Sequence, residues 1–188
     1  MIVFMASYKT EAIILKRINF SEADKILTIF SKHYGKIHVL AKGVRKINSR
    51  KGGNLELFNQ VNLFLAKGRN LDIITEVELQ DSFKSWRRNL IRVGVAFYLT
   101  ELVDKLTAES QQNVGVFSLL RRSLLAIGDR TSLSELIREF EEKMLDGLGF
   151  GVPKQLRDKP GSLSDYIEEV VEKRLKSKDV LKRIQYGK

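Results

Sequence analysis

The chain has no cysteine, only two histidines and only two prolines among its 188 residues. The absence of cysteine excludes disulfides, cysteine-ligated zinc and a thiol nucleophile. The histidines, His33 and His38, lie close together, which leaves few routes to a transition-metal site and disfavours a Ser/His catalytic pair. No apolar run approaches the ~18 residues that cross a bilayer, and the start, MIVFMASY, lacks the basic region of a secretory signal. We expect a soluble cytoplasmic protein.

Motifs that hold phosphate groups of nucleotides are also missing. The sequence contains neither G-x-x-x-x-G-K-[ST] nor G-x-G-x-x-G. The carboxylates gather on segments with helical periodicity, where spacings such as Glu139–Lys143 are typical of solvated ion pairs. These absences favour a binding protein that uses no cofactor and is not an enzyme.

A basic excess is the main positive feature. The chain has 33 Lys and Arg against 23 Asp and Glu, a net charge of +10. Residues 1–80 contain 13 of the basic and 7 of the acidic residues, so most of the excess lies there. Six cations fall within residues 36–51 without one carboxylate. We expect this loop not to fold back on itself, because like charges repel, and to bind a polyanion by releasing condensed counterions.

The loop and a neighbouring turn supply the candidate binding residues. We expect phosphate contacts from Lys42, Arg45, Lys46, Arg50 and Lys51, and secondary ones from Lys67 and Arg69. Among the aromatic residues, Tyr34 lies beside a turn and is the candidate for stacking on bases, whereas Phe30 and Phe64 are assigned to the interior. The alternative is that the charged loop merely keeps the surface soluble.

The first 80 residues have the pattern of β-strands. Short segments rich in Ile, Val, Leu and Phe alternate with turn signals, and we expect strands at Ala12–Ile18, Lys25–Ser31, Lys36–Ala41, Leu57–Ala66 and Leu71–Leu79. Five strands with a longer connection between the third and the fourth fit a closed barrel of the OB type, which commonly binds single strands. An SH3-like barrel fits nearly as well.

After Ser82 the apolar period becomes helical. We expect helices over Phe83–Leu106, over Asn113–Ile127 with Gly128 closing it, from a capping box at Ser132–Glu135 to Gly147, and from about Ser162 with a break near Ser177. Pro153 and Pro160 bracket a linker. The predicted class is α+β, with a five-stranded β-barrel domain at 1–80, of the OB or the SH3-like type, and an all-helical domain at 81–188.

Several segments of the chain resemble the RecO family of bacterial recombination mediators. They are YKTEAIIL from Tyr8, SEADKILTIF from Ser21, AKGVRKINSR from Ala41, YLTELVD from Tyr98 and LDGLGFGVP from Leu145. The resemblance implies an OB-fold followed by a helical domain. It also implies a role in DNA repair that is not enzymatic, in a cytoplasmic, nucleoid-associated protein.

The resemblance also implies activities and partners. Family members bind single- and double-stranded DNA, anneal complementary strands, and act with RecR to load RecA onto DNA coated by the single-stranded-DNA-binding protein, SSB. They capture the acidic C-terminal tail of SSB on the helical domain. In this chain Arg121 and Arg122 interrupt an apolar helix, and we expect them at the lip of a groove for that tail, unless they simply face water.

One departure from the family concerns metal. Many members carry a cysteine zinc module after the Leu-Gly-Phe-x-Pro segment, whereas this chain has residues 154–163, KQLRDKPGSL, and no cysteine. We expect a protein that works without zinc. Two other functions stay open: an RNA-binding OB-fold protein, and a protein-interaction adaptor for which DNA is incidental.

Overall fold

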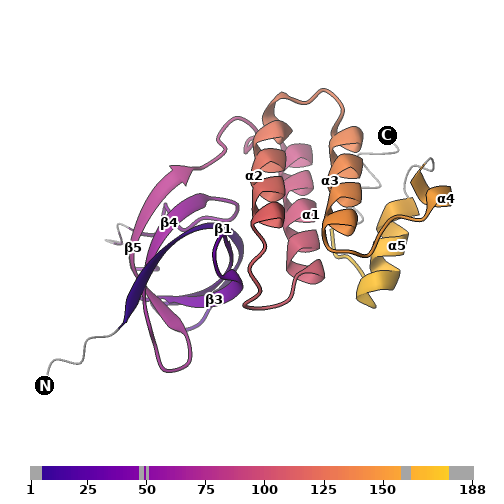
Figure 1. Ribbon diagram of the computed structural model, residues 1–188. Helices are drawn as coiled ribbons and strands as arrows, with labels where there is room; N and C mark the ends of the chain where they lie inside the picture. The colour runs from indigo at the N-terminus through magenta and orange to yellow at the C-terminus, as the bar shows by residue number, and fades with distance from the viewer. Residues whose placement is uncertain (1–5, 47–48, 50, 158–161, 178–188) are drawn as a thin grey trace, which may run out of the picture. The chain divides into compact units, whose positions relative to one another are not determined.

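The computed structural model describes residues 6–46, 49, 51–157 and 162–177. The chain divides into two compact units, Met1–Ser82 with Thr107–Val114, and Phe83–Leu106 with Gly115–Lys188. Strands come first and helices follow, as predicted (Figure 1). The predicted boundary after residue 80 did not foresee that Thr107–Val114 groups with the strands.

The first unit is a closed five-stranded barrel. Its strands are β1 (Ser7–Asn19), β2 (Lys25–Ser31), β3 (Gly35–Ala41), β4 (Gln60–Ala66) and β5 (Asp72–Asp81), in the order β1-β2-β3-β5-β4. All pairs are antiparallel except β3 with β5, which is parallel. This strand order, with its one parallel pair, is that of the OB-fold and not of the SH3-like alternative.

Alternation along the strands separates the barrel interior from its outer face. Leu27 and Ile29 of β2 and Leu63 and Leu65 of β4 belong to one buried core. The assignment of Phe64 to the interior was wrong, because this residue lies between two core leucines and its ring carries the Lys9 ammonium 4.5 Å from its centroid.

Phe30 is fully buried but does not belong to the barrel core. It follows the core residue Ile29 and therefore points to the opposite face of β2. Its assignment to the barrel interior was also wrong: the hydrophobic character of the side chain predicted its burial, but only the strand register determines its face.

The first helix begins later than the helical period indicates. Helix α1 spans Leu90–Leu106, not Phe83–Leu106, and Asn89 begins it by accepting the Arg92 N–H through its side-chain oxygen at 3.1 Å. Helix α2, Val114–Asp129, continues through Gly128. A Cβ on Gly128 would lie 2.5 Å from the Ser85 hydroxyl, so this glycine permits a close approach instead of ending the helix.

The remaining helices are α3 (Leu133–Gly147), α4 (Lys154–Arg157) and α5 (Ser162–Val171). Ser132 caps α3 and accepts the Glu135 N–H, as the capping-box spacing predicted. The predicted linker 154–163 contains α4 and part of α5, and residues 158–161 lie outside the described chain. Helix α5 ends at Val171, before the predicted break at Ser177.

Candidate nucleic-acid interface

The connection between β3 and β4 carries the cations of residues 42–51, which we call the basic loop. Its flanks are anchored in the barrel: Val44 and Leu55 are 8% and 2% exposed and belong to the barrel core. Successive turns join the described part of the segment, with Ser49 N–H donating to Lys46 O and Leu55 N–H to Lys51 O. The prediction that the loop does not fold back was wrong, because the buried side chains of Val44 and Leu55 anchor the segment while Lys42, Arg45 and Lys46 stay exposed.

The basic loop is also fastened to the β1–β2 turn, Phe20–Asp24. The Gly43 N–H donates to a carboxylate oxygen of Asp24 at 2.8 Å, and the Arg45 N–H donates to Ala23 O at 3.0 Å. The Arg45 guanidinium reaches Ser21 O at 2.7 Å. A cation that is held in place loses less side-chain entropy on binding a phosphate than a freely rotating one.

The cations of the basic loop differ in exposure. Lys42, Arg45 and Lys46 are exposed, whereas Lys51 is half-buried and its ammonium donates to Ile74 O at 3.3 Å. Arg50, also a predicted contact, lies outside the described residues. The described part of the loop thus offers three exposed cations, and a fourth that is tied to β5.

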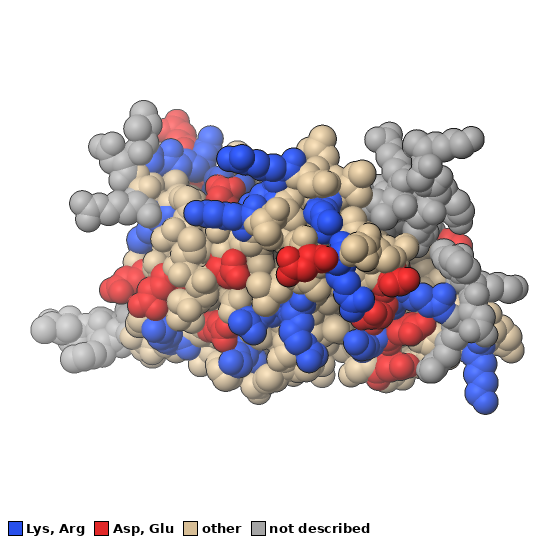
Figure 2. Space-filling view, turned by 90° about the horizontal axis from the view of Figure 1, so that it is seen from above, with Lys and Arg blue, Asp and Glu red and all other residues tan. Residues whose placement is uncertain are grey.

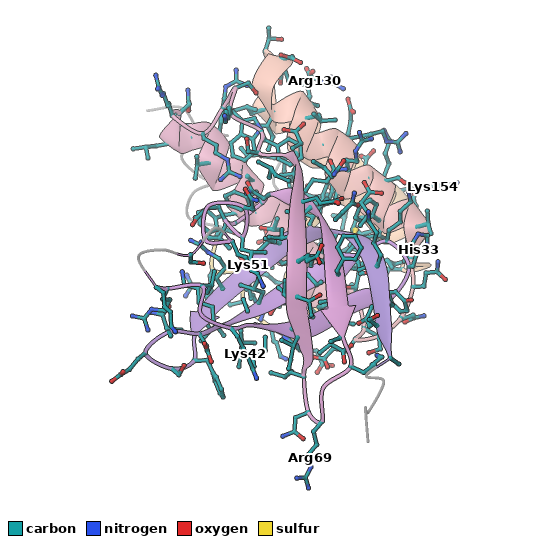
Figure 3. The ribbon with its side chains drawn as sticks, turned by 90° about the vertical axis from the view of Figure 1, so that its left-hand side faces the viewer. His33, Lys42, Lys51, Arg69, Arg130 and Lys154 are labelled. Atoms are coloured by element: carbon teal, nitrogen blue, oxygen red, sulfur yellow. The ribbon has the colours of Figure 1, made fainter. Side chains whose placement is uncertain are left out.

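The other predicted residues lie around a different part of the barrel. Tyr34 stands at the β2–β3 turn with its ring 4.6 Å from that of Tyr8. Lys67 lies 4.7 Å from the Tyr8 ring centroid and 3.0 Å from the Asp72 carboxylate. Arg69 is exposed at the tip of the β4–β5 hairpin (Figure 3). Lys67 is therefore already engaged by the protein itself.

The acid–base groups here are coupled. Burial and the hydrogen bond to Asp72, 2.5 Å away, raise the pKa of the Tyr8 hydroxyl well above its usual value. Burial alone would raise the pKa of Asp72, but the hydrogen bonds from Tyr8 and Lys67 and the charge of Lys67 outweigh it and lower that pKa. At neutral pH the group is thus a neutral phenol beside a carboxylate that is paired with an ammonium.

These groups line a polar pocket of about 420 Å³, which the segment Thr107–Val114 helps to form through Glu109 and Ser110. The Lys36 ammonium donates to Thr107 O at 2.7 Å, and His38 meets a Glu109 carboxylate oxygen at 3.1 Å. Lys36 and Lys67 both have partners in the barrel unit, so the pocket is a poor phosphate site despite its basic residues.

The two groups of predicted residues are separated along the β2–β3 hairpin. Ser31 pairs with Gly35 at its turn, and Lys25 pairs with Ala41 at the end that leads into the basic loop. Six residue steps of strand correspond to roughly 20 Å. Figure 3 shows Lys42 and Lys51 on one side of the barrel, away from His33 of the β2–β3 turn. Tyr34 is thus not beside the basic loop.

The face in Figure 2 carries Lys and Arg side chains interleaved with Asp and Glu. The net charge of +10 therefore does not form one continuous basic surface on this face. A local cluster such as the basic loop has to provide any strong phosphate binding.

In the helical unit, Arg121 and Arg122 are exposed on α2, and the Arg122 guanidinium donates to Ser118 O, one turn back, at 3.3 Å. The flanking Leu120 and Leu124 are fully buried, whereas Leu125 is 39% exposed. Both arginines therefore lie on the surface of the helical unit. The two buried leucines point into its interior, so they do not line the predicted groove.

Within residues 6–46, 49, 51–157 and 162–177, no group of three or more His, Cys, Asp or Glu side chains is arranged to hold a metal ion. In the same ranges, no helix has the length and apolar character to cross a membrane.

Comparison with known families assigns both units. A family model described as "Recombination protein O N terminal" matches residues 5–83, and one described as "Recombination protein O C terminal" matches residues 87–155. The two matches together cover most of the chain, and they divide it close to the point at which the strands give way to helices.

Curated relatives agree. Proteins named DNA repair protein RecO are 41% identical over 143 residues in Roseiflexus sp. RS-1, 37% over 147 in Symbiobacterium thermophilum and 42% over 144 in Desulforamulus reducens. The alignments cover 76%, 78% and 75% of this chain but 50%, 58% and 55% of the relatives. The chain thus spans between half and three fifths of the length of these proteins, and it belongs to the RecO family of DNA repair proteins.

Proposed function

We propose that this protein binds single- and double-stranded DNA through the basic loop and anneals complementary strands. We further propose that it acts with RecR to help load RecA onto SSB-coated single strands. It would do this in the cytoplasm, associated with the nucleoid. The carrying observation is that three exposed cations, Lys42, Arg45 and Lys46, stand on a loop that is fixed to an OB barrel of the RecO family.

The mode of binding follows from the kind of contact. Lys and Arg reach phosphates, which are the same for every sequence, so binding is expected to be nearly independent of sequence. About five contacts on a single strand correspond to a slope of about −3.5 in log affinity against log salt concentration. This function needs neither a catalytic group nor zinc, and the chain has no cysteine to hold a zinc module.

The first experiment measures annealing. Two complementary oligonucleotides, one coated with SSB, are mixed with the full chain without ATP, with and without a chelator, at two salt concentrations. We expect acceleration that the chelator leaves intact and that Arg45→Glu with Lys46→Glu abolishes. The matched control is Lys173→Glu with Arg174→Glu, an adjacent exposed pair of the helical unit with the same charge change. Equal loss in both variants, or none in the first, would contradict the proposal.

Capture of the SSB tail is a separate part of the proposal. Arg121 and Arg122 can pair with acidic side chains or with a terminal carboxylate, because the guanidinium donates two parallel hydrogen bonds. A labelled acidic peptide with the SSB tail sequence should bind the wild type and lose affinity in Arg121→Ala with Arg122→Ala. Equal binding to both proteins would remove these residues from the proposal.

The same preparations distinguish the other two functions. Tighter binding of a structured RNA than of single-stranded DNA, by competition, would favour an RNA-binding role. DNA binding that vanishes near physiological salt, beside tight binding of RecR or SSB, would favour an adaptor.

A further inference from the structure

An apolar stripe crosses the outer face of the barrel beside the basic loop. In the strand register, Ile18 of β1 lies opposite Ile26 of β2, and Ile26 lies opposite Leu40 of β3. The residues next to them, Leu27 and Val39, belong to the barrel core, so Ile26 and Leu40 point outward. Ile18 is 60% exposed, and Ile26 and Leu40 are half-buried.

Phe20 extends this stripe towards the basic loop. It follows Ile18 by two residues, the spacing that returns a side chain to the same face of an extended chain, and it is also 60% exposed. Its backbone N–H donates to Asp24 O at 3.1 Å, and the Asp24 carboxylate in turn accepts the Gly43 N–H of the basic loop. The ring is therefore tied to a fixed turn that contacts the basic loop.

Cations border the stripe. Lys16 precedes Ile18 by two residues on β1 and is exposed, and Lys42 follows Leu40 by two residues. Arg45 is hydrogen-bonded to Ser21, the neighbour of Phe20 in the turn. Isolated exposed apolar side chains are ordinary on protein surfaces, but a contiguous group with a charged rim marks a binding surface.

We propose that Ile18, Phe20, Ile26 and Leu40 form a platform on which unpaired DNA bases rest while the neighbouring cations hold the phosphates. The charge selects the occupant: a positive rim around an apolar surface fits a polyanion with apolar faces, and a single strand presents such faces whereas a duplex stacks them inside. The platform rests on the proposed DNA binding and deepens it, because it assigns base contact to the basic end of the barrel and not to Tyr34.

The platform predicts a preference that phosphate contacts alone do not give. Cations recognise the backbone of any strand, so without the platform a strand stripped of its bases would bind as well as an intact one. With the platform, loss of bases and loss of the Phe20 ring should have the same effect, about tenfold in affinity. Because no phosphate contact is removed, the salt slope should stay the same.

The test measures anisotropy of three labelled probes with the full chain: oligo-dT, an abasic strand of equal length and a duplex. Wild type should bind oligo-dT about tenfold more tightly than the abasic strand. Ile18→Ala with Phe20→Ala should lower the affinity for oligo-dT to that for the abasic strand and leave the abasic strand and duplex unchanged. Phe20→Tyr should keep the preference. Leu90→Ala with Phe97→Ala, exposed apolar residues of the helical unit, is the matched control and should change nothing.

Three outcomes would overturn the platform. They are equal wild-type affinity for oligo-dT and the abasic strand, an equal loss for all three probes in the alanine variant, and unchanged DNA binding in that variant together with loss of RecR or SSB binding, which would make the stripe a protein-docking surface. Failure of DNA binding by the basic loop is a different result: Arg45→Glu with Lys46→Glu would then bind the abasic strand as well as wild type does. Thermal melts of each variant verify that it is folded.

Discussion

Cations lie near both ends of the β2–β3 hairpin, but their surroundings differ. At the end that leads into the basic loop, Lys42, Arg45 and Lys46 are exposed, and backbone carbonyls of the β1–β2 turn hold Arg45 in place. At the turn end, the ammonium groups of Lys36 and Lys67 contact Thr107 O and the Asp72 carboxylate. The number of cations in a segment thus says little about phosphate binding, because Lys36 is buried and Lys67 is paired with a carboxylate, whereas the cations of the basic loop stay exposed.

The anchoring of the basic end gives the largest expected effect. Leu55→Ala removes a side chain that is 2% exposed in the barrel core, and it should lower the free energy of unfolding by about 3 kcal/mol. Urea titration measures this change. Leu90→Ala, at a position that is 86% exposed, should shift the value by less than about 0.5 kcal/mol. If Leu55→Ala has as little effect as Leu90→Ala, the basic loop is not anchored in the core.

The contrast in available cations predicts the next largest effect. Neutralising two phosphate contacts in Arg45→Gln with Lys46→Gln should weaken single-strand binding about 25-fold at 0.1 M salt, since each contact contributes ~0.7 to the salt slope. The matched pair at the other end, Lys67→Gln with Arg69→Gln, should change affinity by at most about fivefold, because Lys67 is paired with Asp72 and only the exposed Arg69 can then contribute a phosphate contact. Comparable losses measured by anisotropy would mean that both ends bind DNA.

Single substitutions sharpen the comparison further. Lys42→Gln should make the slope of log affinity against log salt concentration shallower by ~0.7, whereas Lys67→Gln should leave it unchanged within error. Five salt concentrations between roughly 50 and 200 mM give both slopes. A shallower slope for Lys67→Gln would show that this ammonium leaves Asp72 and contacts phosphate in the complex.

The smallest effect concerns acid stability at the turn end. The pKa of Asp72 is lowered in the folded protein, so its ionised form stabilises the fold above the unfolded pKa, and this contribution is lost as pH falls through the lower, folded value. Because Lys67 is largely exposed, we expect at most ~1 kcal/mol. Asp72→Asn should therefore lose stability at pH 7 and approach wild type near pH 2. A constant difference between the two proteins at all pH values, in urea titrations, would contradict this.

The sequence predicted the strands well because their pattern is local. The bounds of β2 agree with the prediction at both ends, and the capping box at Ser132 predicted the start of α3. Features that depend on the fold were missed. Glycine is common at helix ends, so Gly128 was predicted to end a helix. Its role is instead to leave space for the side chain of Ser85, which is distant in the sequence.

In the candidate site, too, local features were predicted and features that depend on the fold were missed. The clustering of Lys42, Arg45 and Lys46 is visible in the sequence because these residues are neighbours, and the structure keeps them exposed. Lys67 pairs with Asp72 across the turn between β4 and β5, so this pairing depends on the hairpin geometry. The burial of Lys36 depends on a tertiary contact with Thr107, 71 residues away. The apolar residues Ile18, Ile26 and Leu40 come from three strands, and no local sequence pattern indicates that they lie in one row. The sequence feature that could have indicated an apolar surface here is Phe20, an aromatic residue in a polar turn.

The segment Thr107–Val114 has a consequence for the order in which the chain folds. It follows α1 in sequence but completes the barrel, where the Ser110 N–H donates to Lys36 O at 2.8 Å and Gly35 leaves no room for a Cβ against Gln111. During synthesis the five strands emerge first, but residues 107–114 follow only after α1. Ser110 lies 29 residues beyond Asp81, the last residue of β5. About thirty further residues must therefore be synthesised, at roughly 5–20 residues per second, before the last contacts of the barrel unit can form.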